Sequence, residues 1–286
     1  MAAQLAVLQM NSSDTVEDNL IQAEKLIQQA AYRGAKVIVL PECFASYAGK
    51  DTLQIAKQES DNNGPIRQLL ARLAAQHNVW LIGGSIPFLP KENSAGRRAF
   101  SACFVYNDKG KELGQYSKIH LFDVTVSDSK GQYQESKEYM SGSHLLIVDT
   151  PIGRLAPLIC YDLRFPELFR ALINYGVEII CLPSAFTAVT GAAHWDVLMR
   201  ARAIENFCYM AGADQAGIHA DGRETFGHSM IVDPWGKVIA TAETDKPEVI
   251  MAEIDLNRLH QLRGRMPSLK HRQDQLLRNI KVYHYS

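Results

Sequence analysis

The sequence predicts an α/β protein built from two similar halves. Amphipathic helices alternate with short apolar strands along the chain, which is the pattern of layered α/β folds. Residues 34–41 run from a glycine through an apolar strand to a proline, and residues 176–183 repeat that spacing. The alternation predicts the fold class, and the repeat indicates that one unit occurs twice.

The first helix is predicted over residues 15–33, where apolar residues recur at helical spacing. Thr15, with Asp18 three positions on, is typical of a capping box at its start. Gly34 suits the left-handed conformation that ends a helix. The next strand, residues 37–40, is apolar throughout, so we expect it to be buried on both faces.

A second cycle follows, with a helix from Pro65 and an apolar strand at residues 79–82. Two further internal matches occur in the same order along the chain: residues 5–8 with 155–158, and the turns 107–111 with 233–237. Three ordered matches favour two similar halves packed as one domain. Their separation is far too long for a solenoid repeat.

Composition narrows the class of partner. The 286 residues include 30 basic and 31 acidic ones, for a formal charge of -1. This balance offers no electrostatic footprint for nucleic acid or for an anionic membrane surface. No apolar run reaches the ~20 residues of a membrane span. The first residues lack the basic flank of a signal peptide. We therefore expect a cytoplasmic protein whose partner is a small molecule.

The five cysteines form neither a disulfide framework nor a metal-binding pattern. Three of them are predicted to be small core residues, because their neighbours are apolar: Cys103, Cys181 and Cys208. Cys43 follows Glu42, whose negative charge disfavours a thiolate, although position alone does not dismiss it. We expect free thiols, one of which could be chemical.

Reactive groups in layered α/β proteins gather at the carboxyl ends of strands. Cys160 stands at such an end and is the best nucleophile candidate, although a buried core role stays open. Because Pro166 is suited to a first helical turn, we expect a helix to begin just after Cys160. The helix dipole would then favour a thiolate.

A cysteine nucleophile needs a base and a group that holds the developing oxyanion. Histidine is the usual base, but the sequence pairs none of the candidates with Cys160: His120, His194 and His228. A carboxylate at an apolar strand end can serve instead, and Glu42 stands in such a place. Lys118, near another strand end, could supply positive charge. Taken singly, Glu42 and Lys118 could equally be solvated surface residues.

Two segments have no clear periodicity. Residues 122–143 are polar, and we expect a surface loop, of the kind that often carries function. The tail from Pro267 is basic and weakly apolar, which favours a solvated or partner-contacting extension. Accordingly, we expect one domain over residues 1–265 and a C-terminal extension, residues 266–286, at an oligomer interface.

Three motifs in order resemble those of the nitrilase superfamily of carbon–nitrogen hydrolases: residues 40–42, 116–122 and 160–167. The resemblance implies a four-layer αββα sandwich of two pseudo-symmetric halves. It also implies that Glu42 is the general base, that Lys118 stabilises the tetrahedral intermediate and that Cys160 is the nucleophile. Neither a metal nor an organic cofactor is implied.

A second glutamate is implied by the same resemblance. Glu135 stands where the family places a residue that orients the lysine and assists proton transfer, with Glu138 as a nearby competitor. In the implied mechanism the backbone N–H of Tyr161 helps Lys118 to hold the oxyanion while a thioester forms on the cysteine.

The substrate is less determined. Arg164 could pair with a substrate carboxylate or form a structural ion pair. Residues 164–168, 183–205 and 226–236 resemble the branch related to deaminated glutathione amidase, which implies release of 2-oxoglutarate and cysteinylglycine. Three other activities share the same catalytic residues: ω-amidase, N-carbamoyl amino acid hydrolase and nitrilase. A catalytically silent binding module is the non-enzyme alternative. Family members are commonly homodimers or larger homo-oligomers.

Overall fold

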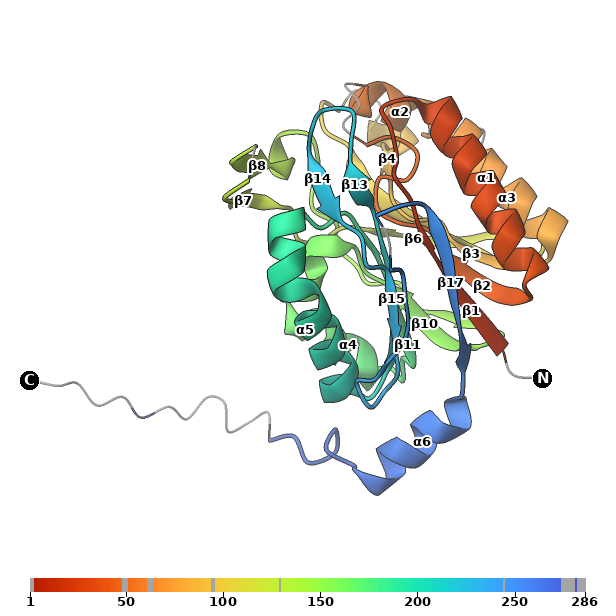
Figure 1. The fold of residues 1–286 in the computed structure, drawn as a ribbon, viewed down its shortest axis with the longest axis vertical. Helices are drawn as coiled ribbons and strands as arrows, with labels where there is room; N and C mark the ends of the chain where they lie inside the picture. Colours follow the sequence, from red (N-terminus) through yellow and green to blue (C-terminus); the bar gives the residue numbers. More distant parts are fainter. Residues whose placement is uncertain are drawn as a thin grey trace, which may run out of the picture.

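Two β-sheets pack face to face between two pairs of helices. The computed structural model describes residues 3–47, 51–60, 64–93, 96–128, 130–243, 245–273 and 281. Helices α1 (Val16–Tyr32) and α3 (Pro65–His77) cover one sheet, and α4 (Pro166–Asn174) and α5 (Ala188–Asn206) cover the other (Figure 1). The four-layer αββα architecture expected from the sequence is confirmed.

The two sheets have matching strand orders. The first sheet runs in the order β17 (Glu248–Ile254), β1 (Ala3–Gln9), β2 (Ala35–Val39), β3 (Trp80–Ile82), β5 (Phe100–Tyr106) and β4 (Ile86–Phe88), with β6 (Glu112–Ser117) also paired to β5. The second runs in the order β9 (Val148–Thr150), β10 (Gly153–Pro157), β11 (Ile179–Ser184), β12 (Tyr209–Asp214), β15 (Met230–Val232) and β16 (Val238–Thr241).

Each sheet has three parallel strands at its centre and antiparallel neighbours outside them. The parallel strands are β1, β2 and β3 in one half and β10, β11 and β12 in the other. The repeated segments 34–41 and 176–183 contain β2 and β11, and the repeated turns join β5 to β6 and β15 to β16. The predicted duplication is therefore confirmed.

Burial of both faces explains why the central strands are apolar throughout. Along β1, Leu5 and Val7 point into the core between the two sheets. Ala6 and Leu8 alternate with them and pack into the core under α1 and α3. Cys103, Cys181 and Cys208 are also fully buried, as predicted.

Local predictions at the start of the chain had mixed outcomes. Helix α1 follows Thr15, and Gly34 has a φ of 90°, both as expected. The predicted capping box is wrong, because the Thr15 side chain makes no capping hydrogen bond. Instead, Asn19 anchors this end of the helix: its Oδ1 accepts from the Ser13 N–H at 2.8 Å and its Nδ2 donates to the Ser13 carbonyl at 2.8 Å.

Two further α-helices and two hairpins complete the α-helices and strands of the described residues. Helix α2 (Thr52–Gln58) lies beside β4, and α6 (Leu256–Arg265) follows β17 and leads into the extension. Two hairpins stand at the same end of the sandwich (Figure 1): β7 (Asp123–Thr125) with β8 (Gln132–Gln134), and β13 (Ala216–Ile218) with β14 (Glu224–Phe226). None of the helices in the described ranges is long and apolar enough to cross a membrane.

Candidate active site

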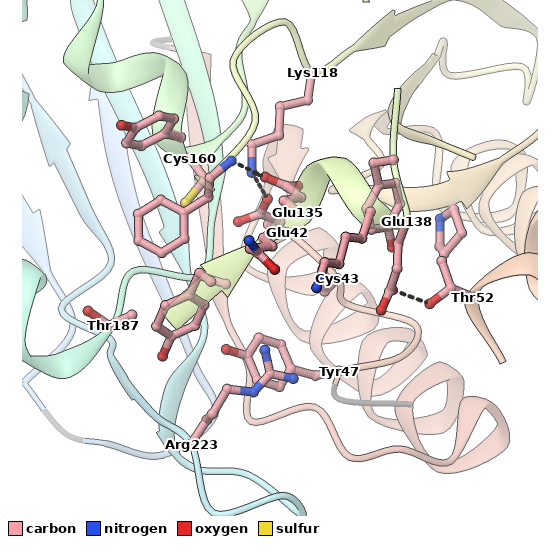
Figure 2. A pocket seen from close by; sticks show the side chains of 18 of the residues that line it. Glu42, Cys43, Tyr47, Thr52, Lys118, Glu135, Glu138, Cys160, Thr187 and Arg223 are labelled. Atoms are coloured by element: carbon pink, nitrogen blue, oxygen red, sulfur yellow. Dashed lines mark hydrogen bonds and ion pairs between the residues drawn. The ribbon is translucent and has the colours of Figure 1, made fainter. Parts of the chain in front are cut away.

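The sandwich brings the three candidate residues to one cavity. Glu42 follows β2, Lys118 follows β6 and Cys160 follows β10, so each lies just beyond the carboxyl end of a strand. All three line a cavity of about 660 Å³ (Figure 2). The first half of the chain supplies the glutamate and the lysine, and the second half supplies the thiol.

Lys118 lies between two carboxylates. Its Nζ is 2.7 Å from Oε1 of Glu42 and 2.9 Å from Oε2 of Glu135 (Figure 2). The lysine is 2 % exposed and Glu42 is 4 % exposed. Burial opposes the ammonium charge, but the charges of Glu135 and Glu42 outweigh it and raise the pKa of Lys118 well above its ordinary value. Lys118 is therefore a permanent cation in the cavity wall.

The polar segment 122–143 is more ordered than the sequence predicted. It contains the β7–β8 hairpin and a short 3₁₀ turn, Glu135–Lys137. The Phe122 N–H donates to Oε2 of Glu135 at 2.6 Å, which holds this carboxylate against Lys118. Burial raises the pKa of Glu135, and the Lys118 charge opposes that rise.

The structure also separates Glu135 from its competitor. Oε2 of Glu138 accepts a hydrogen bond from the Thr52 hydroxyl at 3.1 Å, on the α2 side of the cavity (Figure 2). Glu135, rather than Glu138, contacts Lys118. The resemblance favoured Glu135, and the 3₁₀ turn Glu135–Lys137 is what directs this glutamate, rather than the one three positions on, towards the lysine.

Cys160 begins a tight 3₁₀ turn, Cys160–Arg164, that leads into α4. It is 7 % exposed and has a φ of 46°, which is uncommon for a residue with a side chain. Pro166 is the first residue of α4, as predicted. The predicted preference for a thiolate is wrong. Burial, followed by the negative charge of Glu42, raises the pKa of Cys160 well above its ordinary value, so the resting group is a thiol.

Asp162 is a site residue that sequence reasoning missed. Its fully buried carboxylate accepts from the Tyr116 hydroxyl at 2.6 Å, from the Ile159 N–H at 3.0 Å and from the His120 N–H at 3.0 Å. Tyr116 and His120 flank Lys118 in the chain, and Asp162 lies two residues after Cys160. The carboxylate therefore ties the cysteine turn to the lysine segment. The sequence feature that could have pointed to Asp162 is its position: a carboxylate three residues after an apolar run that ends at Ile159.

The histidines that could have served as the base have other partners. His120 Nδ1 lies 2.9 Å from Oδ1 of Asp162, and its ring stacks on Phe165 with centroids 3.5 Å apart. His194 Nδ1 lies 3.2 Å from Nη1 of Arg164. The His228 ring packs against the ring of Phe226, with centroids 4.4 Å apart. None of these three histidines is among the residues that line the cavity, whereas Glu42 is.

Tyr161 and Arg164, the two residues that the sequence suggested for substrate binding, both line the cavity. The Arg164 guanidinium lies 5.4 Å from the ring centroid of Phe186 and 5.8 Å from that of Tyr161. Across the described ranges, no carboxylate lies within 4 Å of the Arg164 guanidinium. The structural ion pair that the sequence left open is not present among those residues.

Three of the other cavity residues carried no signal in the sequence: Tyr47, Lys130 and Arg223. Cys43, whose role the sequence left open, also lines the cavity. The backbone below Glu42 is fixed by Gln215, whose Nε2 donates to the Glu42 carbonyl at 3.0 Å. Within the described part of the chain, no three His, Cys, Asp or Glu side chains cluster so as to hold a metal ion.

Comparison with known proteins agrees with the geometry. The family model described as carbon–nitrogen hydrolase matches residues 4–264. The deaminated glutathione amidase of Yersinia enterocolitica is 40% identical over 269 residues, which cover 94% of this chain and 92% of that protein. The omega-amidase NIT2-B of Xenopus laevis is 39% identical over 272 residues, covering 95% of each chain.

A solved structure extends the likeness to three dimensions. The Caenorhabditis elegans NitFhit protein superposes with a TM-score of 0.87 at 36% identity, covering 96% of this chain and 67% of that one. The family model and the amidase relatives support hydrolysis of carbon–nitrogen bonds other than peptide bonds. This chain belongs to the carbon–nitrogen hydrolase family.

Proposed function

We propose that the protein hydrolyses a small-molecule amide through a thioester on Cys160. The observation that carries this proposal is the buried cluster in which Glu42 and Glu135 hold Lys118 beside the Cys160 thiol. A cysteine with a raised pKa cannot attack without losing its proton, so a base has to act during the attack. Glu42 is that base in our proposal.

The steps balance without a cofactor. The Cys160 sulfur bonds to the amide carbon while its proton passes to Glu42, and the oxyanion is held by Lys118 and the backbone N–H of Tyr161. The intermediate then collapses, the carbon–nitrogen bond breaks and the amine leaves with the proton from Glu42. Water, deprotonated by Glu42, hydrolyses the thioester and restores the thiol. Glu135 keeps Lys118 charged and oriented throughout.

We infer that the substrate is deaminated glutathione, which yields 2-oxoglutarate and cysteinylglycine. Arg164 supports this inference, because its guanidinium faces the cavity and can pair with the 2-oxo acid carboxylate on the acyl side. Sequence identity alone does not choose between this activity and ω-amidase, since a deaminated glutathione amidase is 40% identical to this chain and an omega-amidase is 39% identical. The resemblance of residues 164–168 to the deaminated glutathione branch favours that activity, because we expect ω-amidases to carry another residue in place of Pro166.

One assay separates the two amidases. Purified protein is given deaminated glutathione and 2-oxoglutaramate in turn, and release of 2-oxoglutarate is measured from each. We expect the higher kcat/KM with deaminated glutathione. A large preference for 2-oxoglutaramate would identify the ω-amidase reaction instead. Release from neither substrate would favour an N-carbamoyl amino acid hydrolase, a nitrilase or a silent binding module, which carbamoyl and nitrile substrates then distinguish.

We also propose that the protein forms a homodimer or a larger homo-oligomer through α5 and the extension, residues 266–286. Large apolar side chains lie exposed on α5 and on the β15–β16 turn, which is hydrogen-bonded to α5 through Arg200 and Gly236. Val197, on α5, is 64% exposed, and Trp235, in the turn, is 54% exposed. Residues 274–280 and 282–286 of the extension lie outside the described residues. Sedimentation equilibrium of the full chain tests this assembly, and a monomer at micromolar concentration would contradict it.

A further inference from the structure

Besides Lys118 and Arg164, four basic side chains of the described residues line the cavity, and the proposed mechanism uses none of them: Arg97, Lys130, Lys137 and Arg223. Lys130 and Arg223 are the two that lie in the turns of the β7–β8 and β13–β14 hairpins. The two hairpins belong to different halves of the chain and stand at the same end of the sandwich (Figure 1). In Figure 2, Arg223 lies beside Tyr47, apart from the group formed by Cys160, Lys118, Glu135 and Glu42.

Arg223 is held in place by its neighbours. Its guanidinium lies over the ring of Tyr47, 4.7 Å from the centroid, and pairs with the carboxylate of Asp221. The Tyr47 ring in turn stacks on the buried His219 at 3.8 Å between centroids. His219 Nε2 lies 2.7 Å from the Thr225 hydroxyl. This chain of contacts fixes the guanidinium before any ligand arrives, which reduces the entropy cost of binding.

Lys130 adds a second positive charge to the same wall. Its ammonium lies 4.8 Å from the ring centroid of Tyr133. Burial and the positive charge of Arg223 lower the pKa of Lys130, so the two cations repel one another across the cavity. Three carboxylates, those of Asp221, Glu138 and Asp128, act on the pKa of Lys130 in the opposite direction, and Asp221 is already paired with Arg223. An anion placed between the two cations would relieve this repulsion.

We propose that Arg223 and Lys130 form a second anion subsite, which binds a carboxylate at the far end of the amine portion of the amide. This proposal rests on the proposed function, in which Arg164 takes the carboxylate on the acyl side. The cavity then recognises an amide that carries a carboxylate at each end. An amide with a small, uncharged amine portion uses only Arg164.

The test combines a change in the enzyme with a matching change in the substrate. The substrates are deaminated glutathione and an analogue in which the terminal carboxylate of the amine portion is replaced by a carboxamide. Arg223→Gln is expected to lower kcat/KM for the dicarboxylate by roughly 10- to 100-fold relative to the carboxamide analogue, because a charge-assisted contact is lost. We call kcat/KM for the dicarboxylate divided by kcat/KM for the carboxamide analogue the substrate ratio. Lys130→Gln is expected to lower this ratio by a smaller factor than Arg223→Gln, since lysine binds carboxylate as a point charge.

Two further variants guard against a purely structural effect. Lys109→Gln removes a surface lysine in the β5–β6 turn, outside the cavity, and should leave the ratio unchanged. Arg223→Lys, which keeps the charge, should restore part of the ratio. Equal losses on both substrates in Arg223→Gln and Lys130→Gln, or no loss on either, would overturn the subsite. In those cases hydrolysis by the wild-type protein would still support the proposed function.

Failure of the proposed function has a different signature. If the wild-type protein releases 2-oxoglutarate from neither deaminated glutathione nor 2-oxoglutaramate, the amidase assignment is contradicted, and the subsite is rejected together with it.

Discussion

The turns that carry Cys43 and Cys160 resemble each other closely. Each follows a parallel strand of its sheet, each cysteine has a positive φ, 54° and 46° respectively, and both residues line the same cavity. Burial, followed by the charge of Glu42, raises the pKa of both thiols. Acidity and location therefore do not distinguish the proposed nucleophile from its neighbour.

What differs is the attachment of each turn to the rest of the site. The Cys43 N–H donates to the Ser85 hydroxyl at 3.1 Å, a neutral contact within the first half. The Cys160 turn is tied by Asp162 to Tyr116 and to the backbone after Lys118, across the two halves. We therefore propose that the attachment of the Cys160 turn to the lysine segment, rather than a low thiol pKa, distinguishes the nucleophile from Cys43.

Replacement of each cysteine by alanine should have the largest effect and tests the comparison directly. Cys160→Ala removes the attacking sulfur, so we expect kcat for an accepted amide to fall by at least ~10³-fold. Cys43→Ala should retain turnover, because its thiol takes no part in the proposed steps. Steady-state kinetics measures both, and circular dichroism confirms that each variant is folded. Turnover retained in Cys160→Ala, or lost in Cys43→Ala, would reverse the assignment.

Weakening the hydrogen bonds that Asp162 makes between the cysteine turn and the lysine segment should have an intermediate effect on kcat. Asp162→Asn weakens the acceptor that joins the two segments, so we expect kcat to fall by roughly 10- to 100-fold through misplacement of the thiol. The free energy of unfolding should fall by about 1–3 kcal/mol, because buried donors lose their partner. Urea denaturation measures the second quantity.

Ser85→Ala is the matched variant for the Cys43 turn. It removes the hydroxyl that holds Cys43, and we expect it to lower stability with little change in kcat. If Asp162 had only a structural role, Asp162→Asn and Ser85→Ala would have similar kcat values. A misplaced thiol lowers kcat with KM for the amide unchanged, whereas weaker substrate binding raises KM.

The smallest expected effect is that of pH on kcat/KM of the wild-type protein. Both Cys160 and Lys118 have raised pKa values, so each keeps its proton as the pH rises from 7 to 9. Because Glu42 takes the thiol proton during the attack, kcat/KM should stay nearly flat over this range. A rise of about tenfold per pH unit would instead mean that a preformed thiolate is the reacting species. Initial rates in constant-ionic-strength buffers decide between the two outcomes.

Alkylation of Cys43 supplies the contrasting pH profile. In the Cys160→Ala protein, iodoacetamide should modify Cys43 faster as the pH rises from 7 to 9, by about tenfold per unit, since only its small thiolate fraction reacts. Peptide mass spectrometry follows the reaction. A rate that levels off below pH 8 would show that the pKa of Cys43 is not raised.

Local pattern predicted the repeated strand–helix units well. Strands buried on both faces need unbroken apolar sequences, and a helix that covers a sheet needs apolar residues at its own period. These requirements act over a few residues, so β2, β11 and α1 could be recognised from the chain alone. The capping box at Thr15 was wrong because Ser13 and Asn19 satisfy one another first.

Local pattern in the sequence predicted the fold class and the duplication, and it placed Glu42 and Cys160 after apolar strands. The resemblance of three motifs to those of the nitrilase superfamily, rather than their spacing, singled out Glu42, Lys118 and Cys160 as the proposed site residues. Only the tertiary structure decided that Glu138 bonds to Thr52 instead of to the lysine, and that Asp162 joins the cysteine turn to the lysine segment. It also decided that Arg223 and Lys130 line the same cavity. The reason is physical: these contacts join groups that are distant in the chain, and burial and neighbouring charge set the protonation of the thiol.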